Sequence, residues 1–275
     1  MTKPLKIWSA LILFLFLFPV FIQLLPGEQP ETSSKKVKES SSSMVYAANI
    51  TEEKRNEELG LNGKRALLYF THTHEAFKPV TEAKQGKIVV SHQTENITKF
   101  GEKLQAQLSI NGVETDILPV NNAEEMAKKR IPHYRAYKAI RPHVEQQLQK
   151  VNYDLIIDMH RDSAGPQITT ATYEGEKYAK VAFVVGTENP NFAKNKAKAQ
   201  QIKDEMERLV PGITRNIITK SRHDGDGKYN QELHPSVVLI ELGGIGNTEE
   251  ELNRTVAVIA KAVTNALSTP GTSTF

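Results

Sequence analysis

After residue 64, short apolar runs alternate with longer segments in which apolar residues recur every three or four positions, and this alternation limits the possible folds more than any other feature. The short runs are rich in β-branched and aromatic residues, as strands are, and the longer spacing is typical of amphipathic helices. The pattern predicts strands at 66–71, 113–118, 155–159, 181–185 and 237–242, and helices at 97–110, 134–150, 191–209 and 248–267. Such alternation predicts an α/β fold with a mainly parallel sheet and helices on both faces.

The N-terminal segment has a different composition. Residues 7–25 are apolar except for Ser9, Pro19 and Gln23. As a helix at ~1.5 Å per residue, they span roughly the ~30 Å hydrocarbon core of a bilayer. Lysines precede the segment, and no small-residue cleavage site follows it closely. We therefore expect an uncleaved, single-pass anchor in the cytoplasmic membrane, with residues 1–6 as a cytoplasmic tip and the rest of the chain outside.

The remaining boundaries follow from composition. Residues 26–61 are rich in Ser, Lys, Glu and Pro, and such a segment buries too little apolar surface to offset its ordering entropy. We expect a flexible tether there, a catalytic domain at 62–268 and a disordered tail at 269–275. The formal charge of +3 comes from 35 basic and 32 acidic residues spread along the chain, so nucleic acid is not an expected partner. Because the chain has no cysteine, any transition-metal site must use His and carboxylate ligands.

Three predicted strands end in polar residues that can do chemistry. His72 and Glu75 follow the first, His160 follows the run at 155–159, and Glu241 lies inside the run at 237–242. Sites in open α/β sheets gather at the carboxyl ends of the strands. Two His and one Glu form a known ligand set for catalytic zinc, which activates a water, and a further carboxylate then serves as proton acceptor and donor. The residues thus predict zinc held by His72, Glu75 and His160, with Glu241 as general base.

Two alternatives stay open for the ligand set. His74 competes with His72, because the two side chains would point the same way if the strand continued through them. Glu95 could be a ligand, although an acid near a helix start is also favoured by the helix dipole. The other histidines are interpreted as surface residues; these are His92, His133, His143, His223 and His234. Arg161 and Asp162 flank His160 and either orient it, hold substrate or pair with each other.

Several segments together resemble the stage II sporulation protein P family. They read Tyr-Phe-Thr-His-Thr-His-Glu-Ala-Phe at 69–77, Asp-Met-His-Arg-Asp-Ser at 158–163, Tyr-Asn-Gln-Glu-Leu at 229–233 and Leu-Ile-Glu-Leu-Gly-Gly at 239–244, followed by Asn247 and Thr248. The resemblance covers about 62–268 and the layout of anchor and tether. This sequence departs from the family motif at Phe70, where many members carry His, and at His74, where Thr is common.

The resemblance implies a zinc-dependent N-acetylmuramoyl-L-alanine amidase with an amidase-like fold, and some members also cut cross-linked stem peptides. It implies His72, Glu75 and His160 as metal ligands and Glu241 as the catalytic carboxylate. Arg161, Asn230 and Asn247 are the expected substrate-binding residues. The implied setting is septal wall thinning and engulfment during sporulation, with peptidoglycan as substrate, stage II sporulation proteins D and M as partners, and the domain on the forespore septum side.

Two other functions compete with this expectation. A zinc peptidase or carboxypeptidase acting on wall peptides fits the same His-x-x-Glu spacing with a distant His and a later Glu. A non-catalytic scaffold that binds the wall is the third possibility, and Glu241 disfavours it, because a binding module does not need a base inside a buried strand.

Overall fold

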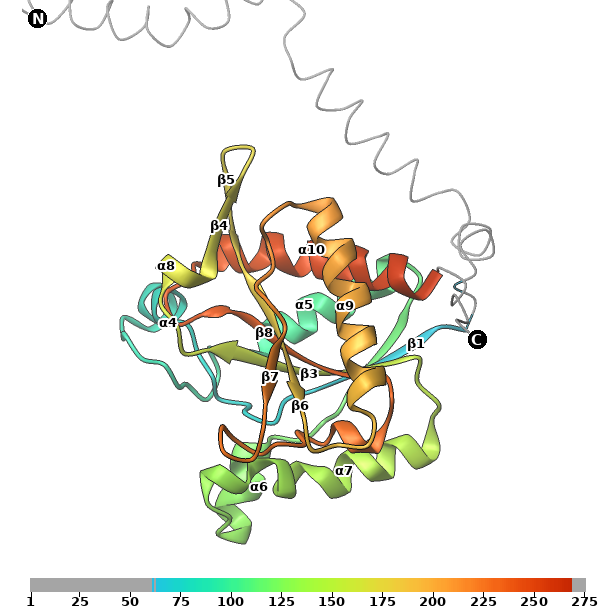
Figure 1. Ribbon diagram of the computed structural model, residues 1–275. Helices are drawn as coiled ribbons and strands as arrows, with labels where there is room; N and C mark the ends of the chain where they lie inside the picture. Colours follow the sequence, from blue (N-terminus) through green and yellow to red (C-terminus); the bar gives the residue numbers. More distant parts are fainter. Residues whose placement is uncertain (1–60, 62, 269–275) are drawn as a thin grey trace, which may run out of the picture. The chain divides into compact units, whose positions relative to one another are not determined.

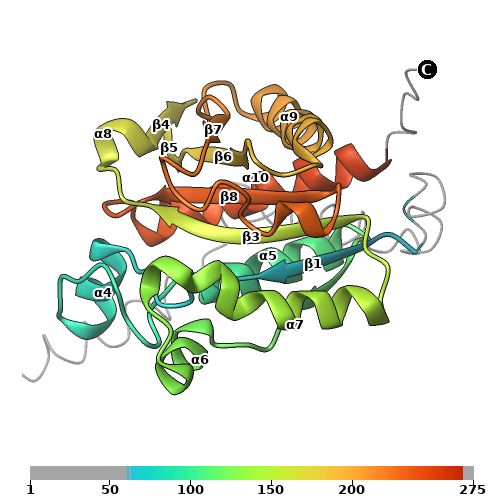
Figure 2. The same ribbon diagram turned by 60° about the horizontal axis from the view of Figure 1, so that its bottom comes forward.

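The computed structural model describes Leu61 and residues 63–268, whose main element is a six-stranded sheet (Figures 1 and 2). Its strand order is β2-β1-β3-β8-β6-β7. The strands are β1 (Arg65–Tyr69), β2 (Glu114–Ile117), β3 (Leu155–Asp162), β6 (Val181–Gly186), β7 (Ile218–Lys220) and β8 (Val237–Gly244). A separate hairpin consists of β4 (Thr170–Tyr173) and β5 (Glu176–Ala179).

Strand direction follows from how the strands are connected. The strands β2, β1, β3 and β8 pair in parallel, whereas β6 is antiparallel to β8 and carries β7 parallel to itself. The sheet is therefore mainly parallel as predicted, but β6 and β7 run the other way. Between β3 and β6 the chain forms only the short helix α8 (Pro166–Thr169) and the hairpin, without a crossover that would return it to the opposite edge. The chain therefore re-enters the sheet at the same end at which β3 leaves it, so β6 runs in the direction opposite to β3 and β8.

Helices cover both faces, as the sequence predicts. Alternate strand residues such as Leu68 and Ile157 face a large core formed with α5 (Thr98–Ile110), α9 (Phe192–Leu209) and α10 (Glu249–Ser268). Their neighbours Leu67 and Ile156 face the other side, where they pack against α7 (Ala136–Lys150). Figures 1 and 2 show α7 on that side of the sheet together with α6 (Asn122–Lys129).

The structure adds elements that the apolar pattern does not reveal. These are α4 (Lys78–Gln85), α6, α8, the β4–β5 hairpin, β7, and two short 3-10 helices, η1 (His133–Arg135) and η2 (Gln231–Leu233). Helix α6 is short and mostly polar, and the side chain of Asn121 caps it by accepting from the backbone N–H of Glu124 at 3.3 Å. Strand β3 continues to Asp162, three residues beyond the predicted end, so His160 lies inside the strand.

The domain boundary lies slightly earlier than predicted. Leu61, expected to end the tether, is 1% exposed and packs into the core, so it belongs to the folded domain. The expected tip at 1–6, anchor at 7–25 and tail at 269–275, and the tether before Leu61, lie outside the described residues. Among the residues that the structure describes, no helix is long and apolar enough to cross a membrane.

Candidate active site

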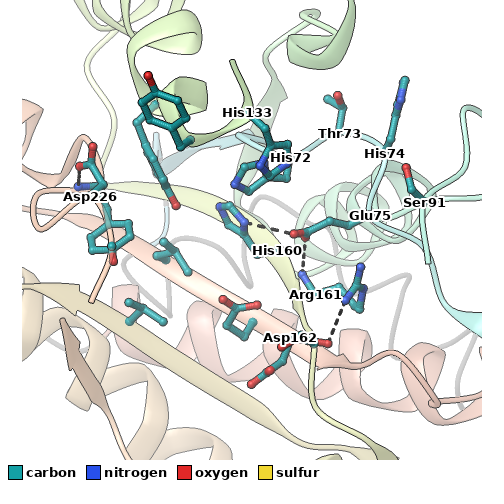
Figure 3. A pocket seen from close by; sticks show the side chains of 18 of the residues that line it. His72, Thr73, His74, Glu75, Ser91, His133, His160, Arg161, Asp162 and Asp226 are labelled. Carbon is teal, nitrogen blue, oxygen red and sulfur yellow. Dashed lines mark hydrogen bonds and ion pairs between the residues drawn. The ribbon is translucent and has the colours of Figure 1, made fainter. Parts of the chain in front are cut away.

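A cleft of about 990 Å³ opens where β1, β3 and β8 end (Figure 3). It lies on the face of the sheet that carries α7. His72, Glu75, His160 and Glu241 all line it, so the structure brings the four predicted site residues to one place. Further lining residues come from the loop after α4, from η1 and α7, and from the segment between β7 and η2.

The segment after β1 separates His72 from His74. Because β1 ends at Tyr69 and residues 71–74 form a turn, the two histidines do not share one direction (Figure 3). The ring centroid of His72 lies 5.3 Å from that of His160, with the rings at 75°. Nε2 of His74 lies 3.3 Å from Nδ2 of Asn121, on the other side of the turn. The geometry therefore favours His72 over His74 as the neighbour of His160.

Glu75 reaches the same centre from the end of the turn. Its Oε2 accepts the backbone N–H of Arg161 at 2.7 Å and lies 3.8 Å from Nδ1 of His160. Burial alone would raise the pKa of Glu75, but His160, His72 and the Arg161 amide outweigh burial and lower it. Glu75 is thus an ionised carboxylate between two imidazoles, which is the arrangement expected of a ligand in a two-His, one-Glu site.

Glu241 is fixed by strand register. His160 and Glu241 are paired residues in the parallel ladder of β3 and β8, so their side chains leave the same face of the sheet. The Oε2 atom of Glu241 is buried without a hydrogen-bond partner. Burial raises the pKa of Glu241 to about 7. A carboxyl group with a pKa near neutrality can both take up and release a proton at physiological pH.

The two histidines have opposite electrostatic surroundings. Burial, followed by the charge of His160, lowers the pKa of His72 to about 4, so His72 is neutral at physiological pH. Burial alone would also lower the pKa of His160, but the carboxylates of Asp158 and Glu75 outweigh burial and raise it well above the usual value. Two carboxylates therefore surround His160 with negative potential, which favours a cation at this position.

The nitrogen and oxygen atoms in the cleft are of the types that bind zinc in proteins. Nδ1 of His72 is buried without a hydrogen-bond partner, and Nδ1 of His160 faces Oε2 of Glu75 at 3.8 Å. Two imidazoles and one carboxylate match the ligand set of catalytic zinc sites. Within the described ranges, no three His, Asp or Glu side chains are already spaced as a closed metal-binding group. The three predicted ligands converge on one cleft, and closing around an ion requires side-chain adjustment.

The three residues expected to bind substrate differ in position. Arg161 lines the cleft, with its guanidinium donating to the carbonyls of Val90 at 2.9 Å and Asp162 at 3.2 Å. Asn230 is 4% exposed and donates to the carbonyl of Tyr137 at 3.0 Å. Asn247 is fully buried, and its Oδ1 accepts the N–H of Gly244 at 2.7 Å. Neither asparagine is among the residues that line the cleft, so the geometry lends no support to their role in substrate binding.

Other expectations from the sequence concern nearby polar residues. Glu95 forms an ion pair with Lys99 at 2.6 Å and is not part of the cleft lining, so it is a structural residue before α5. Asp162 pairs with Arg215 rather than with Arg161. His92 is occupied in its own loop, where Nδ1 accepts the backbone N–H of Glu95 at 2.9 Å.

Two aromatic residues of the site were missed by sequence reasoning. His133, interpreted as a surface residue, is exposed but lines the cleft, and its ring stacks on His72 at 4.4 Å and 13°. The ring of Tyr137 lies 6.2 Å from the rings of both His72 and His160. Tyr137 belongs to the apolar pattern of α7, and His133 precedes that helix, so neither position carries a signal beyond helix formation.

Comparison with known proteins places the chain in a family. The sequence model of the Stage II sporulation protein P family matches residues 23–264. Stage II sporulation protein P of Bacillus subtilis (strain 168) is 33% identical over 192 residues, which cover 70% of this chain and 48% of that protein. The chain thus spans about half the length of this relative.

Three solved structures share weaker similarity. A proposed N-acetylmuramoyl-L-alanine amidase from Neisseria meningitidis has 14% identity and a TM-score of 0.39, covering 74% of this chain and 93% of that chain. Cwp6 from Clostridium difficile has 10% identity and a TM-score of 0.41, with coverages of 75% and 30%. Murine aminoacylase 3 has 12% identity and a TM-score of 0.41, with coverages of 74% and 64%. TM-scores this low do not support an assignment, so the assignment depends on the sequence match. By that match, the chain belongs to the Stage II sporulation protein P family.

Proposed function

We propose that this chain is a zinc-dependent peptidoglycan hydrolase that cleaves the amide between N-acetylmuramic acid and L-alanine. The observation that carries the proposal is the convergence of His72, Glu75 and His160 on one cleft, with the partnerless carboxyl of Glu241 in register beside His160. A binding module has no need to bury such a carboxyl group, because burial without a hydrogen bond costs free energy. The family membership supports a role in the sporulating cell wall.

Each residue has a separate chemical task. His72, Glu75 and His160 would hold the zinc, whose chemistry when bound is to activate a water and polarise the scissile carbonyl. Glu241 takes a proton from the attacking water at its carboxyl group as the new carbon–oxygen bond forms. It then delivers that proton to the nitrogen of L-alanine as the carbon–nitrogen bond breaks. A pKa of about 7 suits both steps, because neither protonation state is strongly favoured at neutral pH.

The cleft is large and offers contact surface around the predicted catalytic residues. Its volume of about 990 Å³ is at the upper end of the ~300–1,000 Å³ typical of small-molecule sites. The exposed ring of Tyr134 lines the cleft next to His133. The rim therefore offers contact surface beyond the reacting amide, as a glycan strand with attached peptides requires.

The cellular setting belongs to the same proposal. The apolar segment at 7–25 would anchor the chain in the cytoplasmic membrane, with the domain outside and, in a sporulating cell, on the forespore side of the septum. Peptidoglycan as the substrate, and stage II sporulation proteins D and M as partners in engulfment, enter the proposal from the motif resemblance at 69–77, 158–163 and 239–244. Fractionation of sporulating cells with a protease-accessibility assay tests the location, and co-purification of the full chain tests the partners.

The test of the reaction is the mass of the products. The full chain, purified in detergent and supplied with zinc, is incubated with purified peptidoglycan, and the soluble products are identified by mass spectrometry. An amidase releases stem peptides with a free L-alanine amino group and leaves glycan with a free lactyl carboxyl. Peptides cut only within the stem would instead identify a peptidase, and binding without any release would identify a scaffold. Glu241→Gln is the matched control and is expected to lose roughly 10²–10⁴-fold in rate.

A further inference from the structure

Asp158 is fully buried in β3 below the cleft, and its charge is unusual there. No Lys or Arg in the described part of the chain forms an ion pair with it, and the recorded ionic contact is to His160. An ionised carboxyl group buried in this way is costly unless hydrogen bonds compensate. Its position next to the apolar residues Ile157 and Met159 of β3 therefore calls for a physical explanation.

One side of Asp158 holds the start of the turn that follows β1. Its Oδ1 accepts the backbone N–H of Thr71 at 3.0 Å, and its Oδ2 accepts the Thr71 hydroxyl at 2.7 Å. The carbonyl of Thr71 accepts from Nδ2 of Asn122 at 2.9 Å. Thr71 directly precedes His72. These bonds therefore fix the backbone from which His72 enters the cleft.

The other side of Asp158 meets His160. Nε2 of His160 lies 3.0 Å from Oδ2 of Asp158, and Nδ1 of the same ring faces Glu75 at 3.8 Å. Turning the ring over would place carbon atoms toward both carboxylates, so the polar contacts select this orientation. The Nε2–H group of His160 is not aligned for a regular hydrogen bond to Asp158. The contact is therefore electrostatic and depends on the 3.0 Å between the two atoms. Histidines that bind metals usually direct the second ring nitrogen to such a partner.

We propose that Asp158 is a positioning residue that ties together the two histidine ligands and presents Nδ1 of His160, not Nε2, to the metal. One carboxylate thereby sets the backbone before His72, in the turn after β1, and the ring of His160 on β3. The proposal rests on the proposed function for the presence of a metal at this site, but not for the bond that is cleaved.

Zinc affinity separates this role from simple folding. Asp158→Asn keeps the shape of the side chain but replaces one of its two oxygens with an N–H₂ group. That group then faces either the backbone N–H of Thr71 or the Thr71 hydroxyl and His160. Thr71→Val removes the hydroxyl, Thr71→Ser restores it, and Asp116→Asn on β2 is a matched control away from the cleft. The affinity of the full chain in detergent is measured by competition with a chromogenic chelator, and stability is measured by unfolding of the metal-free protein.

We expect Asp158→Asn to weaken zinc binding by roughly 10–100-fold, with a smaller loss in Thr71→Val and wild-type affinity in Thr71→Ser and Asp116→Asn. Wild-type zinc affinity in Asp158→Asn would overturn the proposal. So would a variant that unfolds more easily while its folded fraction binds zinc normally, because that pattern describes a purely structural residue.

The coordinating atom is tested by substitution of zinc with ¹¹³Cd in protein labelled with ¹⁵N-histidine. The proposal predicts a scalar coupling between cadmium and Nδ1 of His160, and a coupling to Nε2 would contradict it. A wild-type chain that binds the metal in this way but releases no muropeptides would refute the proposed reaction and leave the role of Asp158 standing. A wild-type chain that binds no metal would refute both.

Discussion

His160 on β3 and Glu241 on β8 are paired residues in two neighbouring parallel strands. Parallel neighbours lie about 4.8 Å apart, so the pairing places a proton acceptor next to a predicted metal ligand without using a loop. The alignment depends on register, because a slip of one residue in β8 would turn Glu241 to the opposite face of the sheet. The candidate site is therefore built on the two central strands of the sheet, near their carboxyl ends.

The buried carboxyl group of Glu241 should make the metal-free protein less stable as the pH rises. Its pKa in the folded protein is about 7, against an ordinary value of 4.5. Because the folded state binds the proton more tightly, its contribution to stability is fully present below pH 4.5 and is lost as the pH rises through 7. Glu241→Gln lacks this loss. We expect the variant to be more stable than the wild type by roughly 2–3 kcal/mol at pH 8, with little difference near pH 4.5.

Urea unfolding in the presence of a chelator at the two pH values measures this difference. A Glu241→Gln protein that is equally destabilised at both would show that Glu241 has a structural partner in the fold.

Gly101 on α5 should not tolerate the usual exchange to alanine. A Cβ atom there would lie 2.2 Å from Cζ of Phe70, which is buried at the end of β1. Alanine favours a helix over glycine by about 1 kcal/mol, but overpacking a core typically costs 1–3 kcal/mol. We expect Gly101→Ala to lower the free energy of unfolding by about 1 kcal/mol, measured by urea denaturation. Ser109→Ala, at an exposed position of the same helix, should change it by less than about 0.5 kcal/mol. A stabilised Gly101→Ala protein would show that Phe70 moves freely.

Asn247 is expected to act on stability rather than on substrate affinity. Its side chain accepts the N–H of Gly244 at 2.7 Å and donates to Oε2 of Glu251 at 2.8 Å, all in a buried setting. Asn247→Ala leaves these groups without partners, and we expect a loss of roughly 1–3 kcal/mol in the free energy of unfolding.

The exposed Asn253 on α10 provides the control, and its exchange to alanine should have little effect on stability. If Asn247→Ala instead kept wild-type stability and raised KM for muropeptides, Asn247 would be a substrate contact after all.

The long elements and the core of the site were predictable because each follows from local sequence. Apolar periodicity located the strands and helices that build both faces, and polar residues inside or after buried runs pointed to His72, His160 and Glu241. The direction of β6 was not predictable in this way. It depends on the short connection after β3, and the residues of β6 itself are equally apolar in either direction.

The rest of the site depends on contacts between distant segments. His133 stacks on His72 only because η1 folds over the end of β1, and no spacing in the sequence encodes that approach. Asn230 and Asn247 lie in recognisable motifs, but a motif does not distinguish a residue that contacts substrate from one that holds a loop. Asp158 was visible as a charge inside an apolar run, and only its contacts to Thr71 and His160 give it a role.

The central claim is that His72, Glu75 and His160 bind zinc while Glu241 remains free to act as a base. The most direct measurement is the zinc content per chain of the purified protein and of single variants at these positions, determined by elemental mass spectrometry. We predict one zinc per chain in the wild type and in Glu241→Gln, and little zinc in His72→Ala and His160→Ala. Full zinc in His72→Ala with loss in His74→Ala, or loss of zinc in Glu241→Gln, would contradict the account.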